Sequence, residues 1–131
     1  MKIATDLEQS KKLAEILPKE TADMSWYRAT IMYPYELHTI YKGHGVMIDG
    51  SDSLIPAWSL SALLKLFPRS IKTEKNGQTY LCVGKTYEER WNVEYVFDDI
   101  DKLCRECGSI QEDLVDACVE MIEKLKEKGL I

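Results

Sequence analysis

The chain has 131 residues, 45% of them hydrophobic and 30% charged, a balance typical of one folded globular domain rather than a disordered segment. Its formal net charge of -5 disfavours a nucleic-acid partner, because phosphate binding needs clustered basic side chains and the lysines here are scattered among acids. No apolar run approaches the roughly 18 residues that span a bilayer, and no secretory leader follows Met1, so we expect a cytoplasmic protein without a membrane partner.

The first predicted element is a helix from Asp6 to Leu17. Thr5 and Glu8 have the spacing of a capping box, in which the two residues satisfy each other's backbone amides. Pro18 then ends the pattern, since proline cannot continue a helix.

The next stretch, from Trp26 to Tyr41, is rich in aromatic and β-branched residues, which is typical of strands. Pro34 cannot donate a hydrogen bond to a ladder. The stretch is therefore either an edge strand or two short strands broken at Pro34. Glycine-rich and aspartate-rich loop sequences on either side of Val46–Ile48 follow it.

A strongly apolar helix is predicted between Pro56 and Pro68. Its leucines and phenylalanine recur at the spacing that lines one helical face, and from Leu60 to Phe67 only Ser61 and Lys65 are polar. A helix that is apolar over most of its circumference has to be covered on nearly all sides, so we expect this segment at the centre of the core.

Two β elements follow. Asn76-Gly77, between Ile71–Lys75 and Gln78–Val83, is the sequence signature of a type I′ hairpin. In Trp91–Phe97, apolar residues alternate with polar ones, which describes a strand with one face on a core and one in water.

The C-terminal helix has the clearest pattern. Ser109 and Glu112 have the spacing of a second capping box, and Gly129 is a typical residue at a helix C-terminus. The intervening residues form a broad apolar stripe that includes Cys118. The segment that contains Cys104 and Cys107, between the last predicted strand and this helix, is interpreted as a short polar turn or helix.

These elements predict a single α+β domain over residues 1–131. We expect a small antiparallel sheet of three to five strands with about three helices packed mainly on one face.

Four segments carry a family resemblance: Glu8–Leu13, Thr21–Met24, Pro56–Leu64 and Leu114–Ile122. Together they resemble a family of uncharacterised small proteins of Bacteroides-type bacteria, their prophages and mobile elements. The resemblance implies one compact domain of bacterial or phage origin, and it carries over no catalytic residues.

The only metal-like spacing is the pair Cys104 and Cys107. Structural zinc takes four ligands, which His38 and His44 could complete only across the fold. Nothing in the spacing requires such a site, so we expect reduced thiols, no metal and no cofactor.

No Ser-His-acid set or other catalytic constellation is recognisable, so no catalytic residues are predicted. Aromatic residues are numerous, and we expect most of them in the core. Tyr33, Tyr35 and Trp91 are the candidates for an interaction patch, because Trp and Tyr anchor protein interfaces. Tyr33 and Tyr35 flank Pro34 at a predicted strand edge, which would suit strand addition or homodimer pairing.

The sequence thus favours a non-enzymatic accessory protein of a bacterial mobile element or phage, acting on an unknown protein partner or on a second copy of itself. The alternative is a small ligand-binding domain or enzyme with a pocket between the sheet and the central helix.

Overall fold

The computed structural model describes residues 1–39, 54–73, 77–97 and 105–131. Its helices and antiparallel sheets confirm the α+β fold class. By contacts the chain divides into two compact units. The N-terminal unit comprises Ile3–Ala62, and the C-terminal unit comprises Leu63–Ile131 together with Met1 and Lys2.

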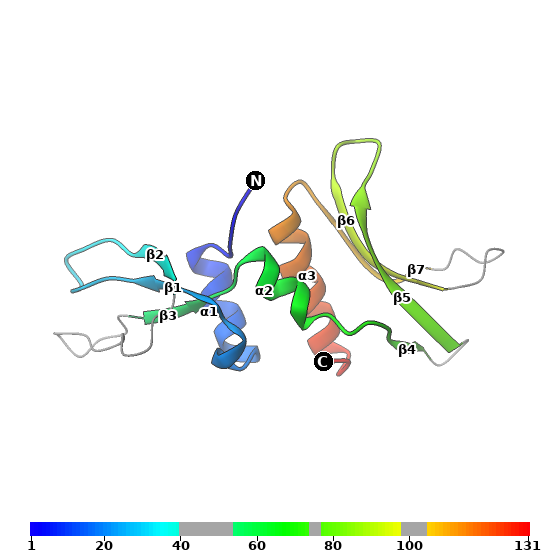
Figure 1. Ribbon diagram of the computed structural model, residues 1–131, viewed down its shortest axis with the longest axis horizontal. Coiled ribbons are helices and arrows are strands. Elements are labelled where there is room, and N and C mark those ends of the chain that lie inside the picture. The colour runs from blue at the N-terminus through cyan, green and yellow to red at the C-terminus, as the bar shows by residue number, and fades with distance from the viewer. Residues whose placement is uncertain (40–53, 74–76, 98–104) are drawn as a thin grey trace. The chain divides into compact units, whose positions relative to one another are not determined.

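The N-terminal unit combines helix α1 (Leu7–Ile16), a short 3-10 turn η1 (Lys19–Thr21) and a three-stranded antiparallel sheet. The sheet has the order β2-β1-β3, so β1 is central. Its strands are β1 (Met24–Tyr27), β2 (Glu36–Thr39) and β3 (Leu54–Ala57), and α1 packs against β3 (Figure 1). Of the two alternatives for the aromatic-rich stretch, the structure has two short strands. The chain between them, residues 28–35, includes Pro34.

Helix α1 is confirmed, with its start moved by one residue. Asp6, rather than Thr5, is the N-cap: its Oδ1 accepts a hydrogen bond from the Gln9 amide at 2.8 Å. The Gln9 side chain accepts one from the Asp6 amide at 3.1 Å, which completes a capping box. Thr5 is not free to cap because its hydroxyl is buried and bonded elsewhere, to Ser10 and to the Trp58 amide.

The segment between Pro56 and Pro68 is not one helix, as the sequence predicts, but a strand followed by a helix. Its first residues lie in β3, which pairs with β1, and the helix α2 is confined to Leu60–Leu66. The Ser59 hydroxyl accepts a hydrogen bond from the Ala62 amide, as an N-cap does, at 3.1 Å. The expected burial of α2 is confirmed in part: Ala62 and Leu63 are buried, the other three leucines are half-buried, and Ser61 and Lys65 are exposed. The boundary between the two units falls within this helix.

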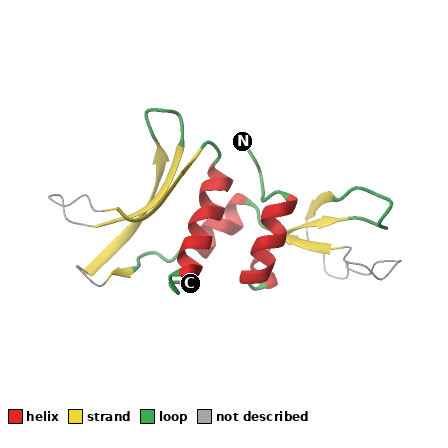
Figure 2. Cartoon of the chain, turned by 180° about the vertical axis from the view of Figure 1, so that it is seen from behind, coloured by secondary structure: helices red, strands yellow, loops and turns green. Residues whose placement is uncertain are grey.

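The C-terminal unit contains a four-stranded antiparallel sheet of order β4-β5-β6-β7 and helix α3 (Leu114–Glu127), which packs against β6 and β7 (Figure 2). The strands are β4 (Lys72–Thr73), β5 (Gly77–Lys85), β6 (Trp91–Phe97) and β7 (Arg105–Gln111). The expected hairpin between β4 and β5 and the expected strand β6 are confirmed. Thr73 pairs with Gly77, however, so three residues separate the paired positions rather than the two of a type I′ turn.

The predicted start of the last helix is wrong. Ser109 lies in β7, paired with Val93, and its hydroxyl donates to Glu120 on α3 at 2.8 Å. Asp113 caps the helix instead, because its Oδ1 accepts from the Val115 amide at 2.9 Å. The interpretation of the segment around Cys104 and Cys107 as a turn or helix is likewise wrong for residues 105–107, which belong to β7.

The predicted end of the last helix is confirmed. Gly129 has a φ of 70° and donates its amide to the Lys126 carbonyl at 3.0 Å. The Leu130 amide donates to the Leu125 carbonyl at 2.8 Å. These two bonds form a Schellman motif, which favours glycine at the left-handed position.

Candidate functional site

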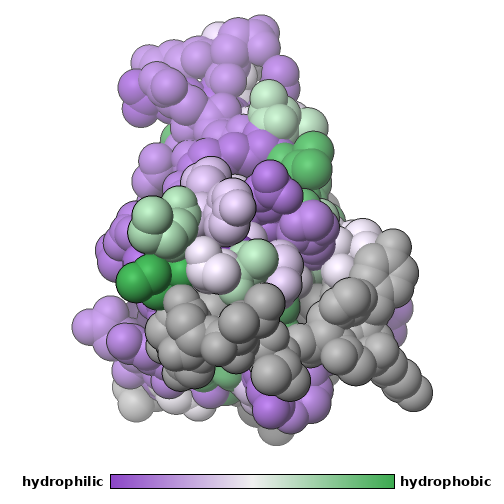
Figure 3. Space-filling view, turned by 90° about the vertical axis from the view of Figure 1, so that its left-hand side faces the viewer, coloured by the Kyte–Doolittle hydropathy of each residue, from purple (hydrophilic) through white to green (hydrophobic). Residues whose placement is uncertain are grey.

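Three consecutive apolar residues of the N-terminal unit, between β1 and β2, are largely exposed. Ile31 is 62% exposed, Met32 85% and Tyr33 62%, and Pro34 is also exposed. We call this segment, Ile31–Pro34, the hydrophobic tip. A space-filling view from the side of this unit shows hydrophobic areas among hydrophilic ones (Figure 3). Single exposed apolar side chains are ordinary, but a run of them is not.

The hydrophobic tip is held by a defined turn. The Tyr33 amide donates to the Thr30 carbonyl at 3.1 Å, the bond of a β-turn. The Met32 amide donates to the Thr30 hydroxyl at 3.2 Å, so a threonine side chain braces the same turn. Ile31 and Met32 occupy the two central positions of this turn, which explains why their side chains are so exposed.

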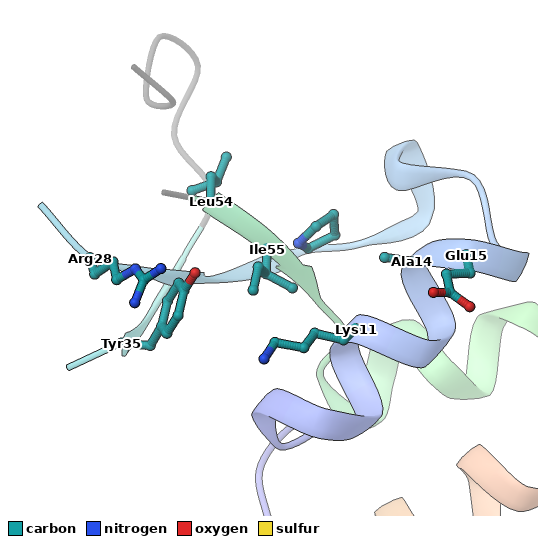
Figure 4. Close-up of a pocket in the computed structure, with 8 residues that line it drawn as sticks. Lys11, Ala14, Glu15, Arg28, Tyr35, Leu54 and Ile55 are labelled. Carbon is teal, nitrogen blue, oxygen red and sulfur yellow. The ribbon is translucent and has the colours of Figure 1, made fainter. Parts of the chain in front are cut away.

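A groove of about 630 Å³ lies in the same unit, between α1, β3 and the chain that joins β1 to β2. Lys11, Glu15 and Arg28 are its charged lining residues, and Ala14, Leu54 and Ile55 are among the apolar ones. The Arg28 guanidinium carbon lies 4.3 Å from the centre of the Tyr35 ring, within the range of a cation–π contact. The groove therefore combines apolar surface with charges of both signs (Figure 4).

A smaller hollow of about 190 Å³ lies beside the hydrophobic tip. It is lined by Tyr27, Arg28, Tyr33 and Glu36, among others, so Arg28 borders both hollows.

The three residues predicted as an interaction patch fall in different units. Tyr33 is exposed in the hydrophobic tip, and Tyr35 is half-buried against Arg28 in the groove. Trp91 begins β6 of the C-terminal unit, where the Lys85 ammonium lies 5.2 Å from its ring centre. The structure brings Tyr33 and Tyr35 into one unit, and a patch that includes Trp91 stays a prediction.

The residues considered for a zinc site cannot be assembled from what the structure describes. Cys104 and His44 lie outside the described residues, and Cys107 is described only by its backbone, which pairs with Tyr95 in the sheet. His38 lies on β2, with its Nε2 3.4 Å from a Glu36 carboxylate oxygen. Within the described ranges, no three His, Cys, Asp or Glu side chains are grouped as metal ligands.

Two titratable groups with shifted pKa values, Cys118 and Glu120, lie on α3. In both, the shift is caused by burial or by hydrogen bonds within the fold. Burial, aided by the Asp113 charge, raises the pKa of the Cys118 thiol to about 12. The hydrogen bond from Gln111 is the main cause that lowers the pKa of Glu120, assisted by Lys124 and Ser109 and opposed by burial. Glu120 thus ties α3 to β7.

Sequence reasoning missed Ile31, Met32, Lys11 and Arg28. The first two lie in a stretch with strand composition, and Thr30 was the only local sign of the turn. Lys11 and Arg28 are brought into one groove only by the packing of α1 on the sheet, for which the sequence holds no local signal.

Within the part of the chain that the structure describes, each helix is too short or too polar to cross a bilayer. No protein-family model, curated protein sequence or solved structure matches this chain.

Proposed function

We propose that this chain is a non-enzymatic accessory protein of a bacterial mobile element or phage, acting in the cytoplasm through protein–protein contact. The hydrophobic tip is the proposed contact surface, and its partner is a protein with an apolar cleft. The bacterial and mobile-element origin rests on the sequence resemblance. The contact function rests on the exposure of the tip.

The observation that carries the proposal is the run of three consecutive side chains, Ile31–Tyr33, each more than 60% exposed. Leaving such a run in water has no benefit for folding, whereas burying it against a partner removes apolar surface from water at about 25 cal/mol per Å². The hydrogen bonds of Thr30 also support this reading. They hold the turn before any partner arrives, so less conformational freedom is lost on binding.

A photo-crosslinking amino acid at position 32 of the full-length chain tests the proposal in the bacterial host. The matched control carries the same amino acid at position 87, since Tyr87 is fully exposed on the turn after β5, in the other unit. We expect a crosslinked partner from position 32 that position 87 does not give.

The partner is then purified and its affinity for the chain measured by calorimetry. Ile31→Asp and Met32→Asp should each weaken binding by about tenfold or more, whereas Tyr87→Ser should change it less than about twofold. Equal crosslinking from both positions, or an affinity insensitive to the two aspartates, contradicts the proposal. A crosslink between two copies of this chain would identify the partner as a second copy.

A further inference from the structure

The groove of the N-terminal unit is large enough for a small molecule, and its lining is divided between polar and apolar residues. Its volume of about 630 Å³ falls within the range of about 300–1,000 Å³ common for ligand pockets. Such pockets join mostly apolar walls to a few polar groups that fix the ligand's orientation. This inference concerns a different surface from the hydrophobic tip and does not depend on the proposed function.

One end of the groove is positively charged. Figure 4 shows the Lys11 side chain extending from α1 toward Tyr35 and Arg28. Within the described residues Arg28 makes no ion pair, and its Nε is buried without a hydrogen-bond partner. In the described part of the chain Lys11 has one ion pair, with Glu8 at 3.5 Å, where both side chains are largely exposed. Exposed pairs of this kind are weak, so Lys11 can turn to another anion at little cost.

The two cations that line the groove come from different elements, Lys11 from α1 and Arg28 from the chain after β1. The Tyr35 ring contacts the face of the Arg28 guanidinium and holds it in place. The N–H donors at the edge of the guanidinium can then bind a carboxylate.

The rest of the groove limits what such an anion can carry. Leu54, Ile55 and Ala14 provide an apolar wall next to the cations. Glu15 lies at the end away from Arg28, one helical turn beyond Lys11 (Figure 4). An elongated dianion would place a second negative charge toward Glu15, and like charges repel.

We propose that this groove binds a small monocarboxylate with an apolar body. The carboxylate binds to Lys11 and Arg28, and the apolar body lies on Ile55 and Leu54. Neither the sequence analysis nor any comparison assigns a ligand to these residues.

The probe for the test is 3-phenylpropionate, titrated into the isotope-labelled full-length chain and followed by amide chemical shifts. From the usual affinity per atom of small ligands, we expect saturation with a Kd of about 1 mM. The shifts should centre on the amides of Ala14 and Ile55. The primary amide 3-phenylpropanamide has the same shape without the charge, and it should bind about tenfold more weakly or not at all. Equal binding of acid and amide overturns the proposal, as does no saturable shift up to about 10 mM.

Lys11→Gln is the decisive variant because Lys11 is exposed and its removal leaves the fold intact. Lys12→Gln is its matched control: it removes the same charge from the neighbouring position of α1, which does not line the groove. We expect Lys11→Gln to weaken 3-phenylpropionate binding about threefold or more, and Lys12→Gln to change it by less than about 1.5-fold. If the two variants weaken binding equally, the carboxylate is attracted only by the overall positive charge of α1, and the proposed site is overturned.

Discussion

Thr5 connects α1, β3 and both tryptophans of the N-terminal unit, and its hydroxyl offers a sharp test of how this unit is held together. The Thr5 hydroxyl accepts a hydrogen bond from the Trp58 amide at 3.1 Å and shares one with the Ser10 hydroxyl at 2.7 Å. The Thr5 amide donates to the Trp58 carbonyl at 2.9 Å, and its carbonyl accepts from the Trp26 indole at 3.1 Å. Thr5, Ser10 and Trp58 are all fully buried.

Thr5→Val keeps the shape of the side chain and replaces the hydroxyl with a methyl group. Two buried groups, the Trp58 amide and the Ser10 hydroxyl, then lose a partner, each at about 1–3 kcal/mol. The added methyl group recovers about 1 kcal/mol by apolar burial. We therefore expect the free energy of unfolding to fall by about 3 kcal/mol. Thr5→Ser keeps the hydroxyl and should cost about 1 kcal/mol.

A double-mutant cycle with Ser10→Ala separates the hydrogen-bond network from a general packing defect. Alone, Ser10→Ala removes one bond and should cost about 1 kcal/mol. In the Thr5→Val background it removes a buried hydroxyl that has already lost its partner, so it should recover part of the lost stability instead of adding to the loss. Urea unfolding followed by circular dichroism gives the four free energies, and hydrogen exchange of the Trp58 amide gives a local measure. Additive losses, or a loss below about 1 kcal/mol for Thr5→Val, would refute the reasoning.

Three further predictions concern the C-terminal unit. Asp113→Ala removes the cap of α3 and should lower the free energy of unfolding by about 1 kcal/mol in urea titrations, whereas Asp113→Asn should retain most of it. The folded pKa of Glu120 lies below its unfolded value, so its stabilisation is present above the unfolded pKa and is lost as pH falls through the folded pKa. The melting temperature of the Glu120→Gln variant should therefore fall less than that of the unmodified protein when the pH is lowered through the range in which carboxylates are protonated. Because burial raises the pKa of Cys118 to about 12, only about one thiol in 10⁴ is ionised at pH 8, and Cys118 should resist iodoacetamide in the native state while half-buried Cys82 reacts. Peptide mass mapping of the labelled protein measures this difference, and equal labelling of the two thiols would contradict it.

Local sequence signals located α1 and the end of α3, but they did not locate the starts of α2 and α3. The end of α3 at Gly129 depends on one residue that tolerates a positive φ, and such a signal can be read from neighbouring positions alone. The start of α1 is less certain from sequence, because Thr5 and Asp6 are both good N-caps. Which of them caps the helix is decided by Trp58, which lies more than 50 residues away and binds the Thr5 hydroxyl.

Strand β7 could not be predicted from its own residues. Arg105–Gln111 has little β-branched or aromatic content, and it contains Gly108, which is unfavourable in a strand. The glycine has a reason that only the sheet reveals: a Cβ at this position would lie 3.3 Å from the Cβ of its cross-strand neighbour Glu94. β7 is stabilised by its antiparallel pairing with β6 and by the hydrogen bond of Ser109 to Glu120 on α3.

The two proposed surfaces differ in what creates them. The hydrophobic tip is a local feature, since Thr30 and the three residues after it form the turn by themselves. The groove is not local: Lys11 and Ile55 form its walls only while α1 is bound to the end of β3, and that connection runs through Thr5 and Trp58. Loss of the buried hydroxyl network would therefore open the groove and leave the tip intact. The proposed ligand groove and the proposed contact surface therefore depend on different hydrogen bonds.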